Sequence, residues 1–298
     1  MKKIEDLKIL VVGDIMLDKY VMGEVERISP EAPVPIVHVH EEYSTLGGCG
    51  NVVRNIVEIG ANVTCVASVG DDENGRIVLG KLAKLGVDAC LVKESRCTIV
   101  KERVIADERK IQMLRIDREV IRPIDPEIVI PELYNDDFYF DIVVVSDYAK
   151  GMITNKLMKH LNNDDTKLIV DPKPANKKIY GFPYMITPNR KELVQMGGVN
   201  ELISNGAKYV LETKGRDGMT LYDEIESWDI DAEPVEVYNV SGAGDTVVAV
   251  MAVCISMGYD PVESATIANK CAGYVVTQPG TCVIPREMFL TYLEVYYT

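Results

Sequence analysis

Hydrophobic runs that each end in polar or glycine residues recur along this chain. The first, "LKILVVGD", is continuously apolar up to Gly13 and Asp14, which is typical of a strand buried on both faces. Runs of the same kind follow in "NVTCVASVG", "DIVVVSDYAKG", "KLIVDPK", "YMITPN" and "AKYVLETKG". We therefore predict a set of buried strands whose carboxyl ends carry the polar residues.

Between these runs, apolar residues recur with the spacing of helices. The predicted helices are "GNVVRNIVEIGA", "ENGRIVLGKLAKLGV" and "DTVVAVMAVCISMG", the last of which ends at Gly258. Strands that alternate with helices indicate an α/β fold with a mostly parallel sheet and right-handed crossovers. Since no repeat or linker divides the chain, we expect one domain over residues 1–298, with its ligand site at the carboxyl ends of the strands.

Two stretches, residues 18–45 and 96–118, alternate polar and apolar positions without helical periodicity. This pattern predicts antiparallel ribbons, the second with a turn near "ADERK". We expect the two ribbons to form a small sheet over one end of the main sheet. Such a sheet would act as a lid or as the surface of a homodimer, and the plainer alternative is a peripheral hairpin.

Composition and charge narrow the function classes. Of the 298 residues, 47% are apolar and 26% charged, and no run approaches the roughly 18 apolar residues that span a membrane. Neither end resembles a targeting segment, so we predict a cytoplasmic protein without membrane contact. A net charge of −14 argues against nucleic-acid binding, although a local site can still bind a small anion.

The seven cysteines are odd in number and form no C-x-x-C pair. Most of them stand among apolar neighbours, as in "VTCVAS". Buried free thiols therefore fit better than disulfides or a zinc site.

The segment "SGAGDTVVAVMAV", residues 241–253, carries the strongest candidate chemistry. "VEVYNV" before it is a predicted strand, so Ser241–Gly244 would form a strand-to-helix turn. The free N–H groups of a helix start favour an anion, and glycines allow it to approach closely. Asp245 is then either a favourable partner of the helix dipole or a base that accepts the proton of a hydroxyl attacking phosphorus. Spacing alone leaves both open.

The common nucleotide-binding motifs fail to match. "GDDENGRI" has arginine in place of the P-loop lysine and lacks the following Ser or Thr, and "GAGDTV" lacks the last glycine of a dinucleotide fingerprint. The sequence therefore supports neither a P-loop ATPase nor a Rossmann dehydrogenase.

Three motifs in order resemble the ribokinase-like (PfkB-type) carbohydrate kinases: "LGGCGNVVRNIVEIGANVTCVASVGDDENG", "ITPNRKEL" and "NVSGAGDTVVAVM". More narrowly, "VVGDIMLDKYVMGEVERISPEAPVPIV", "IQMLRID", "VVSDYAKG" and "VDPK" resemble the kinase domain of bacterial D-glycero-β-D-manno-heptose-7-phosphate kinases. Those enzymes phosphorylate the anomeric hydroxyl and often carry a fused nucleotidyltransferase domain, for which 298 residues leave no room. The resemblance implies a three-layer α/β/α fold, ATP and Mg²⁺.

The resemblance also assigns roles around the nucleotide. Asp245 would be the general base, and the backbone of Gly242, Ala243 and Gly244 the anion hole. Asn189 and Glu192 would organise the Mg²⁺–nucleotide phosphates through water, although the same spacing fits a helix cap with a capping-box acid. The residues expected to border the nucleotide are Thr213, Gly215, Gly218 and, near the base or ribose, Asn269.

For the sugar, the carboxylate of Asp14 and the amide of Asn51 suit hydroxyl groups, and Gly47 and Gly48 allow close approach; a turn cap is the alternative role of Asp14. A phosphorylated sugar also needs cations, and the candidates are Lys101, Arg103, Arg115, Lys150 and Lys173. An ordinary surface charge is the alternative for each of them, and Lys173 is also a candidate for the transferring phosphate.

One position departs from the family pattern. Related kinases commonly have aspartate where Asn239 stands, and that region holds a monovalent cation in some members; the amide weakens such a site and leaves K⁺ activation open. We expect an ATP-dependent kinase that acts on heptose 7-phosphate at its anomeric oxygen. The alternatives are another carbohydrate or nucleoside kinase and a catalytically silent sugar- or nucleotide-binding regulator.

Overall fold

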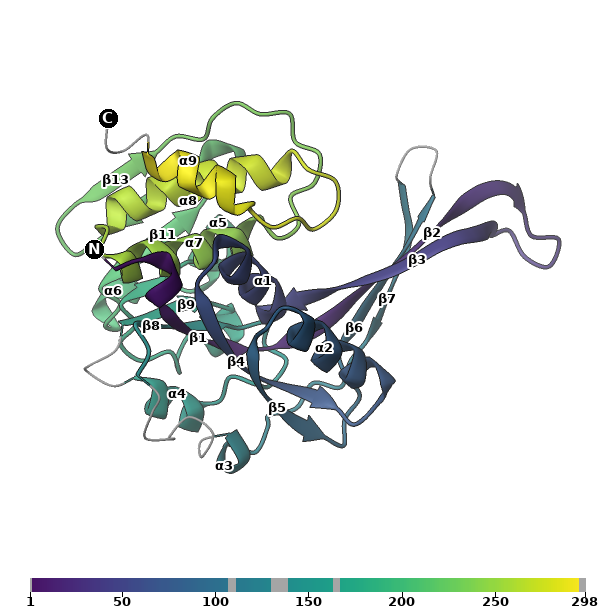
Figure 1. Ribbon diagram of the computed structural model, residues 1–298, viewed down its shortest axis with the longest axis horizontal. Helices are drawn as coiled ribbons and strands as arrows, with labels where there is room; N and C mark the ends of the chain where they lie inside the picture. Colours follow the sequence, from purple (N-terminus) through teal and green to yellow (C-terminus); the bar gives the residue numbers. More distant parts are fainter. Residues whose placement is uncertain (1, 107–110, 130–138, 163–166, 295–298) are drawn as a thin grey trace.

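A nine-stranded sheet with helices on both faces forms the body of the protein (Figure 1). The computed structural model describes residues 2–106, 111–129, 139–162 and 167–294. The strands of this sheet are β1 (Lys8–Gly13), β4 (Asn62–Gly70), β5 (Asp88–Glu94), β8 (Ile142–Ser146), β9 (Lys167–Asp171), β10 (Met185–Ile186), β11 (Tyr209–Thr213), β12 (Met219–Tyr222) and β13 (Ser227–Ile230). Their order is β13-β12-β11-β10-β9-β8-β1-β4-β5, parallel except for the antiparallel β12 and β13.

Two hydrophobic clusters separate the helices into two layers. In β1, Ile9 and Val11 point into one cluster, and Leu10 and Val12 into the other. The first cluster is covered by α1 (Cys49–Ile59), α2 (Glu73–Lys84), α7 (Ala243–Met257), α8 (Pro261–Val276) and α9 (Arg286–Glu294). The second is covered by α3 (Pro126–Val129), α4 (Asn155–Leu161), α5 (Arg190–Gln195) and α6 (Val199–Ser204). The predicted three-layer α/β/α arrangement is thus confirmed; short 3-10 turns occupy Ile4–Asp6, Pro174–Asn176 and Gly215–Asp217.

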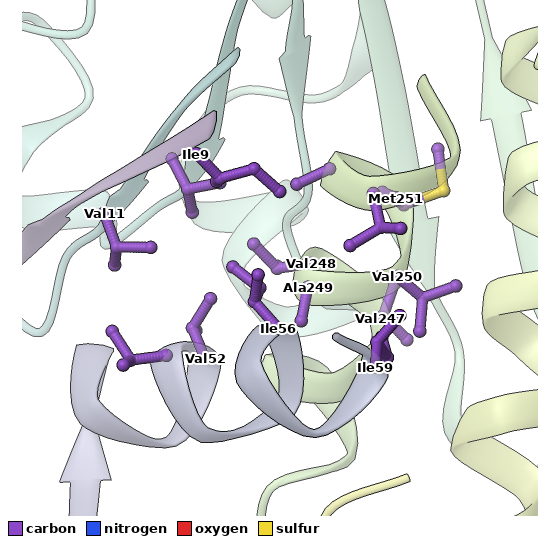
Figure 2. Close-up of a cluster of buried hydrophobic side chains, with 14 of the residues drawn as sticks. Ile9, Val11, Val52, Ile56, Ile59, Val247, Val248, Ala249, Val250 and Met251 are labelled. Atoms are coloured by element: carbon purple, nitrogen blue, oxygen red, sulfur yellow. The ribbon is translucent and has the colours of Figure 1, made fainter. Parts of the chain in front are cut away.

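The packing of α1 against α7 lies at the centre of the larger cluster. Figure 2 shows Val52 and Ile56 of α1 between α7 and the side chains of Ile9 and Val11. Residues 245–255 of α7 are all buried, as expected of a helix that is apolar on every side. This contact brings together two segments that lie almost 200 positions apart in the sequence.

One buried amide fixes the register of that contact. The Asn55 side chain, fully buried in α1, donates to the Asn51 carbonyl at 2.9 Å. Its Oδ1 accepts hydrogen bonds from the Thr246 hydroxyl of α7 and from the Ile284 N–H, both at 3.1 Å. Asn55 therefore ties α1 to α7 and to the segment that leads into α9.

The second, four-stranded sheet projects from one side of the body (Figure 1). It consists of β2 (Ile15–Ile28), β3 (Pro35–Gly48), β6 (Val100–Ala106) and β7 (Ile111–Arg118), in the order β3-β2-β6-β7. The predicted small sheet is confirmed, but β2 starts earlier and β3 ends later than expected. The two hairpins are antiparallel, and β2 pairs with β6 in parallel. Most of the turn expected at "ADERK" lies outside the described residues.

The strand predicted at "VEVYNV", residues 235–240, is wrong. This segment is irregular, and its Tyr238 and Asn239 N–H groups donate to the Val276 carbonyl at 2.8 and 3.0 Å. The alternating valines imitate a strand because some of them line a cavity wall, not because they pair in a sheet. Ser241–Gly244 is consequently a loop-to-helix turn.

The cysteines are free thiols, as predicted. Four are buried, two are half-buried, and Cys97 is exposed, which corrects the expectation for that residue. No helix within the described ranges is long and apolar enough to cross a membrane.

The role of Asn55 gives a stability prediction. Asn55→Ala should lower the free energy of unfolding by about 2 kcal/mol, because the Thr246 hydroxyl and the Ile284 N–H lose their buried acceptor. Urea denaturation measures this change. Asn200→Ala, on the exposed side of α6, is the matched control and should change stability by less than about 0.5 kcal/mol. Equal stability of the two variants would contradict the structural role of Asn55.

Candidate active site

The turn before α7 places helix N–H groups at the mouth of a cavity. Gly242 has a φ of 86°, and a Cβ there would lie 2.7 Å from the Asn51 amide nitrogen, so only glycine fits. A Cβ at Gly244 would meet no atom within 4 Å, which leaves open space beside the backbone. Ala243 begins the helix and, with Gly244, lines the cavity. A helix start of this form can hold an anion.

Asp245, in the first turn of α7, is buried and held by two donors. Its Oδ2 accepts from the Asn51 amide at 2.8 Å, and its Oδ1 from the Tyr148 hydroxyl at 2.9 Å. Burial raises the pKa of Asp245 to about 6, although both hydrogen bonds act to lower it. The carboxylate is therefore ionised at neutral pH and close to the pKa that suits a general base.

The cavity beside this turn has a volume of about 740 Å³, within the range of small-ligand sites. Its walls come from the carboxyl ends of β9 and β11, the irregular segment 232–240, and α8. All the predicted nucleotide residues line it, namely Asn189, Glu192, Thr213, Gly215, Gly218 and Asn269, together with Lys173 and residues 242–245. Valines of segment 232–240 give part of the wall an apolar character that suits a flat ring.

Asn189 and Glu192 form the capping box that the sequence analysis gave as an alternative. The Asn189 side chain accepts from the Lys191 and Glu192 N–H groups, and Glu192 Oε2 accepts from the Asn189 N–H, all at 3.0 Å. The other Glu192 oxygen pairs with Lys173. Glu192 still borders the cavity, so a role toward Mg²⁺ stays a prediction.

Asp14 takes the turn-capping position that was its alternative role. Its Oδ2 accepts from the N–H groups of Tyr148 at 2.9 Å and Lys150 at 3.0 Å, and its Oδ1 from that of Met152 at 3.0 Å. These bonds fix the loop after β8. A carboxylate has about four acceptor positions, so a contact with a sugar hydroxyl stays a prediction.

The two glycines before α1 approach protein atoms closely. A Cβ at Gly47 would lie 2.1 Å from Asp18 Oδ2, and one at Gly48 would lie 2.2 Å from the Asp14 carbonyl. Gly48 also has a positive φ of 60°, at the N-terminus of α1. These contacts explain both glycines without a ligand, and they bring Asn51 to Asp245.

The candidate cations of the small sheet and its surroundings differ in their partners. Of the five predicted sugar-binding cations, four are paired with carboxylates: Arg103 with Asp18 at 2.7 Å, Lys150 with Glu119 at 2.7 Å, Arg115 with Asp117 at 2.9 Å, and Lys173 with Glu192 at 2.5 Å. Lys101 makes no ion pair with any residue in the described ranges, and its Nζ lies 5.3 Å from the centre of the Tyr148 ring. Lys101 is thus the candidate whose charge is least neutralised.

The sequence analysis missed two residues that the structure places beside Asp245 and Lys173. Tyr148 donates to Asp245, and Asp171, at the end of β9, lines the cavity. Desolvation raises the pKa of Asp171 well above its usual range. Both follow or end predicted strands, so the expectation that polar residues gather at strand ends contained the signal.

Asn239 stabilises the turn before α7. Its Oδ1 accepts from the Ser241 N–H at 2.8 Å. Within the described part of the chain, no group of three His, Cys, Asp or Glu side chains is arranged to hold a metal ion. A monovalent cation near Asn239 stays an open prediction.

The fold, the glycine turn and the cavity define a class of phosphate-transferring enzymes, and comparison with known proteins identifies the family. The model of the pfkB family carbohydrate kinases matches residues 6–287. The chain therefore belongs to this family of carbohydrate kinases.

Sequence relatives agree with this family, and solved structures show the fold. Bifunctional protein HldE of Desulfatibacillum aliphaticivorans is 40% identical over 96% of this chain, and that of Paramagnetospirillum magneticum is 40% identical over 95%. The chain spans only 63% and 62% of those proteins. Escherichia coli phosphofructokinase-2, in a tetrameric inhibited form, superposes with a TM-score of 0.80 at 17% identity, covering 97% of this chain and 99% of that one. Thermotoga maritima ribokinase gives 0.74 at 19%, with the same coverage, so the fold is ribokinase-like.

The pKa of Asp245 predicts how activity depends on pH. Because a general base must be ionised, kcat/KM should fall as the pH drops through about 6 and protonates Asp245. The measurement is the pH profile of kcat/KM for the sugar substrate at saturating ATP. A profile that stays flat down to pH 5 would contradict an essential carboxylate with this pKa.

Proposed function

We propose that this protein transfers the γ-phosphoryl group of ATP to the anomeric hydroxyl of D-glycero-D-manno-heptose 7-phosphate, giving the 1,7-bisphosphate. The family supports the sugar kinase activity. The narrower substrate is supported by the likeness to HldE proteins and by the quoted heptose-kinase motifs. The observation that carries the proposal is a buried, hydrogen-bonded Asp245 beside the glycine turn at the start of α7.

The proposed reaction is a single in-line transfer. As the anomeric oxygen forms its bond to the γ-phosphorus, its proton passes to Asp245 and the bond to the β–γ bridging oxygen breaks, which releases ADP. The N–H groups of Ala243 and Gly244 stabilise the charge on the phosphoryl oxygens, and Lys173 lies near enough to the same cavity to add a positive charge. Catalysis therefore depends mainly on positioning and on fixed charges.

The lining of the cavity fits a nucleotide and its metal. Thr213, Gly215, Gly218 and Asn269 line the cavity and would border the nucleoside part, and Glu192, which also lines it, would border the phosphate part. Mg²⁺ keeps several waters and needs few protein carboxylates when phosphates also coordinate it, so a single glutamate acting through water is sufficient. When bound, the metal would neutralise the charge on the β- and γ-phosphates.

The sugar would lie between the body and the four-stranded sheet, which we interpret as a lid. Asp14 and Asn51 lie on the body side, and Lys101 and Arg103 come from β6 of the sheet. Because Lys101 has no carboxylate partner in the described ranges, it is the favoured residue for the 7-phosphate. Arg103 would first have to exchange its contact with Asp18.

A rival proposal is a silent regulator that binds sugar or nucleotide without turnover. A binder has no need of a carboxylate held in place by two side-chain donors beside an anion site. This geometry favours the kinase.

Removal of the base tests the activity. Asp245→Asn should retain the fold and bind ATP normally, but should lose about 10²–10⁴-fold in kcat, the usual contribution of a general base. ADP release measures turnover, and calorimetry measures ATP binding. Turnover near that of the wild type would overturn the catalytic assignment of Asp245.

The substrate is tested by comparing kcat/KM for heptose 7-phosphate, fructose 6-phosphate, ribose and free heptose. Heptose 7-phosphate should be preferred, and Lys101→Met should raise its KM roughly 10-fold, because a charge-assisted hydrogen bond to phosphate is lost. Arg118→Met, a lid cation already paired with Glu102, is the control and should leave this KM near its original value. A preference for ribose or a free sugar would overturn the substrate and leave the kinase activity standing.

A further inference from the structure

Tyr148 is the second donor to the candidate base. Its hydroxyl donates to Asp245 Oδ1 at 2.9 Å, while Asn51 donates to Oδ2 at 2.8 Å. One donor on each oxygen fixes both the rotation and the position of the carboxylate. Each oxygen retains a second acceptor position for a substrate hydroxyl.

Three further contacts hold Tyr148 itself. Its backbone N–H donates to Asp14 Oδ2 at 2.9 Å. The ammonium groups of Lys101 and Lys173 each lie 5.3 Å from the centre of its ring, within the range of a cation–π contact. Lys101 belongs to β6 of the lid and Lys173 follows β9 of the body, so this ring connects the two sheets beside Asp245.

The Tyr148 hydroxyl stays protonated over the pH range in which Asp245 can act as a base. Desolvation, together with the nearby Asp245 and Asp171 carboxylates, raises the pKa of Tyr148 well above its usual range. The hydroxyl is therefore a donor at neutral pH, and a donor favours the ionised form of the carboxylate that accepts it.

We propose that Tyr148 is a positioning residue that keeps the Asp245 carboxylate correctly oriented and ionised, and that its ring links the lid residue Lys101 to this base. This inference rests on the proposed role of Asp245 as general base. It assigns a function to a residue that the glycine-turn motif does not contain.

Other charged groups also act on Asp245, and the test must leave them unchanged. Asp18 raises its pKa and Lys173 lowers it, while Arg54 and Asp171 lie close enough to interact with it electrostatically. Asp14 and the neutral Cys49 thiol are next to the same region. Deletion of the Tyr148 hydroxyl removes one hydrogen bond and changes no charge.

The experiment compares pH profiles of kcat/KM. In Tyr148→Phe, the acid limb of the profile, where activity falls at low pH, should move up by roughly 1 pH unit because Asp245 loses a donor to its ionised form. At pH 8, kcat should fall roughly 10-fold because the carboxylate is less well oriented. The KM for ATP should stay near the wild-type value. Tyr222→Phe is the matched control, because it removes a tyrosine hydroxyl that donates to another carboxylate, Glu212, at 3.1 Å; its acid limb should not move.

A second variant keeps the proposal testable if Tyr148→Phe fails to fold. Replacement of Tyr148 by 3-fluorotyrosine keeps the shape and makes the phenol a stronger donor, so the acid limb should move to lower pH. Opposite shifts in the two variants support the proposal. The proposal is overturned if the acid limb of the fluorotyrosine variant does not move. It is also overturned if the Tyr148→Phe enzyme folds, keeps the wild-type acid limb and only lowers the KM for sugar, because the Tyr148 hydroxyl would then merely occupy the place of the substrate.

The two proposals fail separately. If Asp245→Asn retains turnover, the proposed function falls, and the role of Tyr148 falls with it. If Asp245→Asn is inactive while both Tyr148 variants keep the wild-type limb, only the inference about Tyr148 is overturned.

Discussion

The contact between α1 and α7 is the constraint on which the rest of the site depends. Two buried polar pairs, Asn51 with Asp245 and Asn55 with Thr246, join the first two turns of α1 to the first turn of α7 in an otherwise apolar interface. Buried polar groups are costly unless every partner is in place, so the pairs permit only one register of the helices. The register of the two helices in which these buried polar groups all find partners therefore also fixes the direction of the Asp245 carboxylate.

The environment of Asp245 balances two opposing effects. Burial disfavours its charge, whereas the Asn51 and Tyr148 donors favour it, and the resulting pKa of about 6 lies between that of an ordinary aspartate and that of an aspartate buried without donors. A more exposed carboxylate would be a weaker base, and one buried without donors would be protonated at neutral pH. Neutral donors achieve this balance without placing a cation where the substrate hydroxyl must approach.

Much of the architecture could be predicted from hydrophobic patterns, because those patterns are local. The continuous apolar run before Gly13 and the helix that ends at Gly258 were predicted correctly from residues that are adjacent in sequence. The strand expected at 235–240 was wrong because a cavity wall can also alternate apolar and polar positions. The contacts of Asp245 with its partners could not be predicted from local patterns, since Asn51 lies 194 positions away and Tyr148 lies 97 away.

The distribution of cations bears on how a protein of net charge −14 would bind the two anionic substrates proposed for it. Arg103, Arg115 and Lys150 already have carboxylate partners, so a phosphate gains little from them unless those pairs exchange. For the transferring phosphate, Lys173 is likewise paired, with Glu192, so the group without a counter-ion is the neutral backbone of the glycine turn, which carries partial positive charge. What remains for the distal phosphate is Lys101, whose own pKa is lowered by desolvation. An anion placed beside that ammonium would relieve part of this cost, so the charge of the proposed substrate would help to hold the lid against the body.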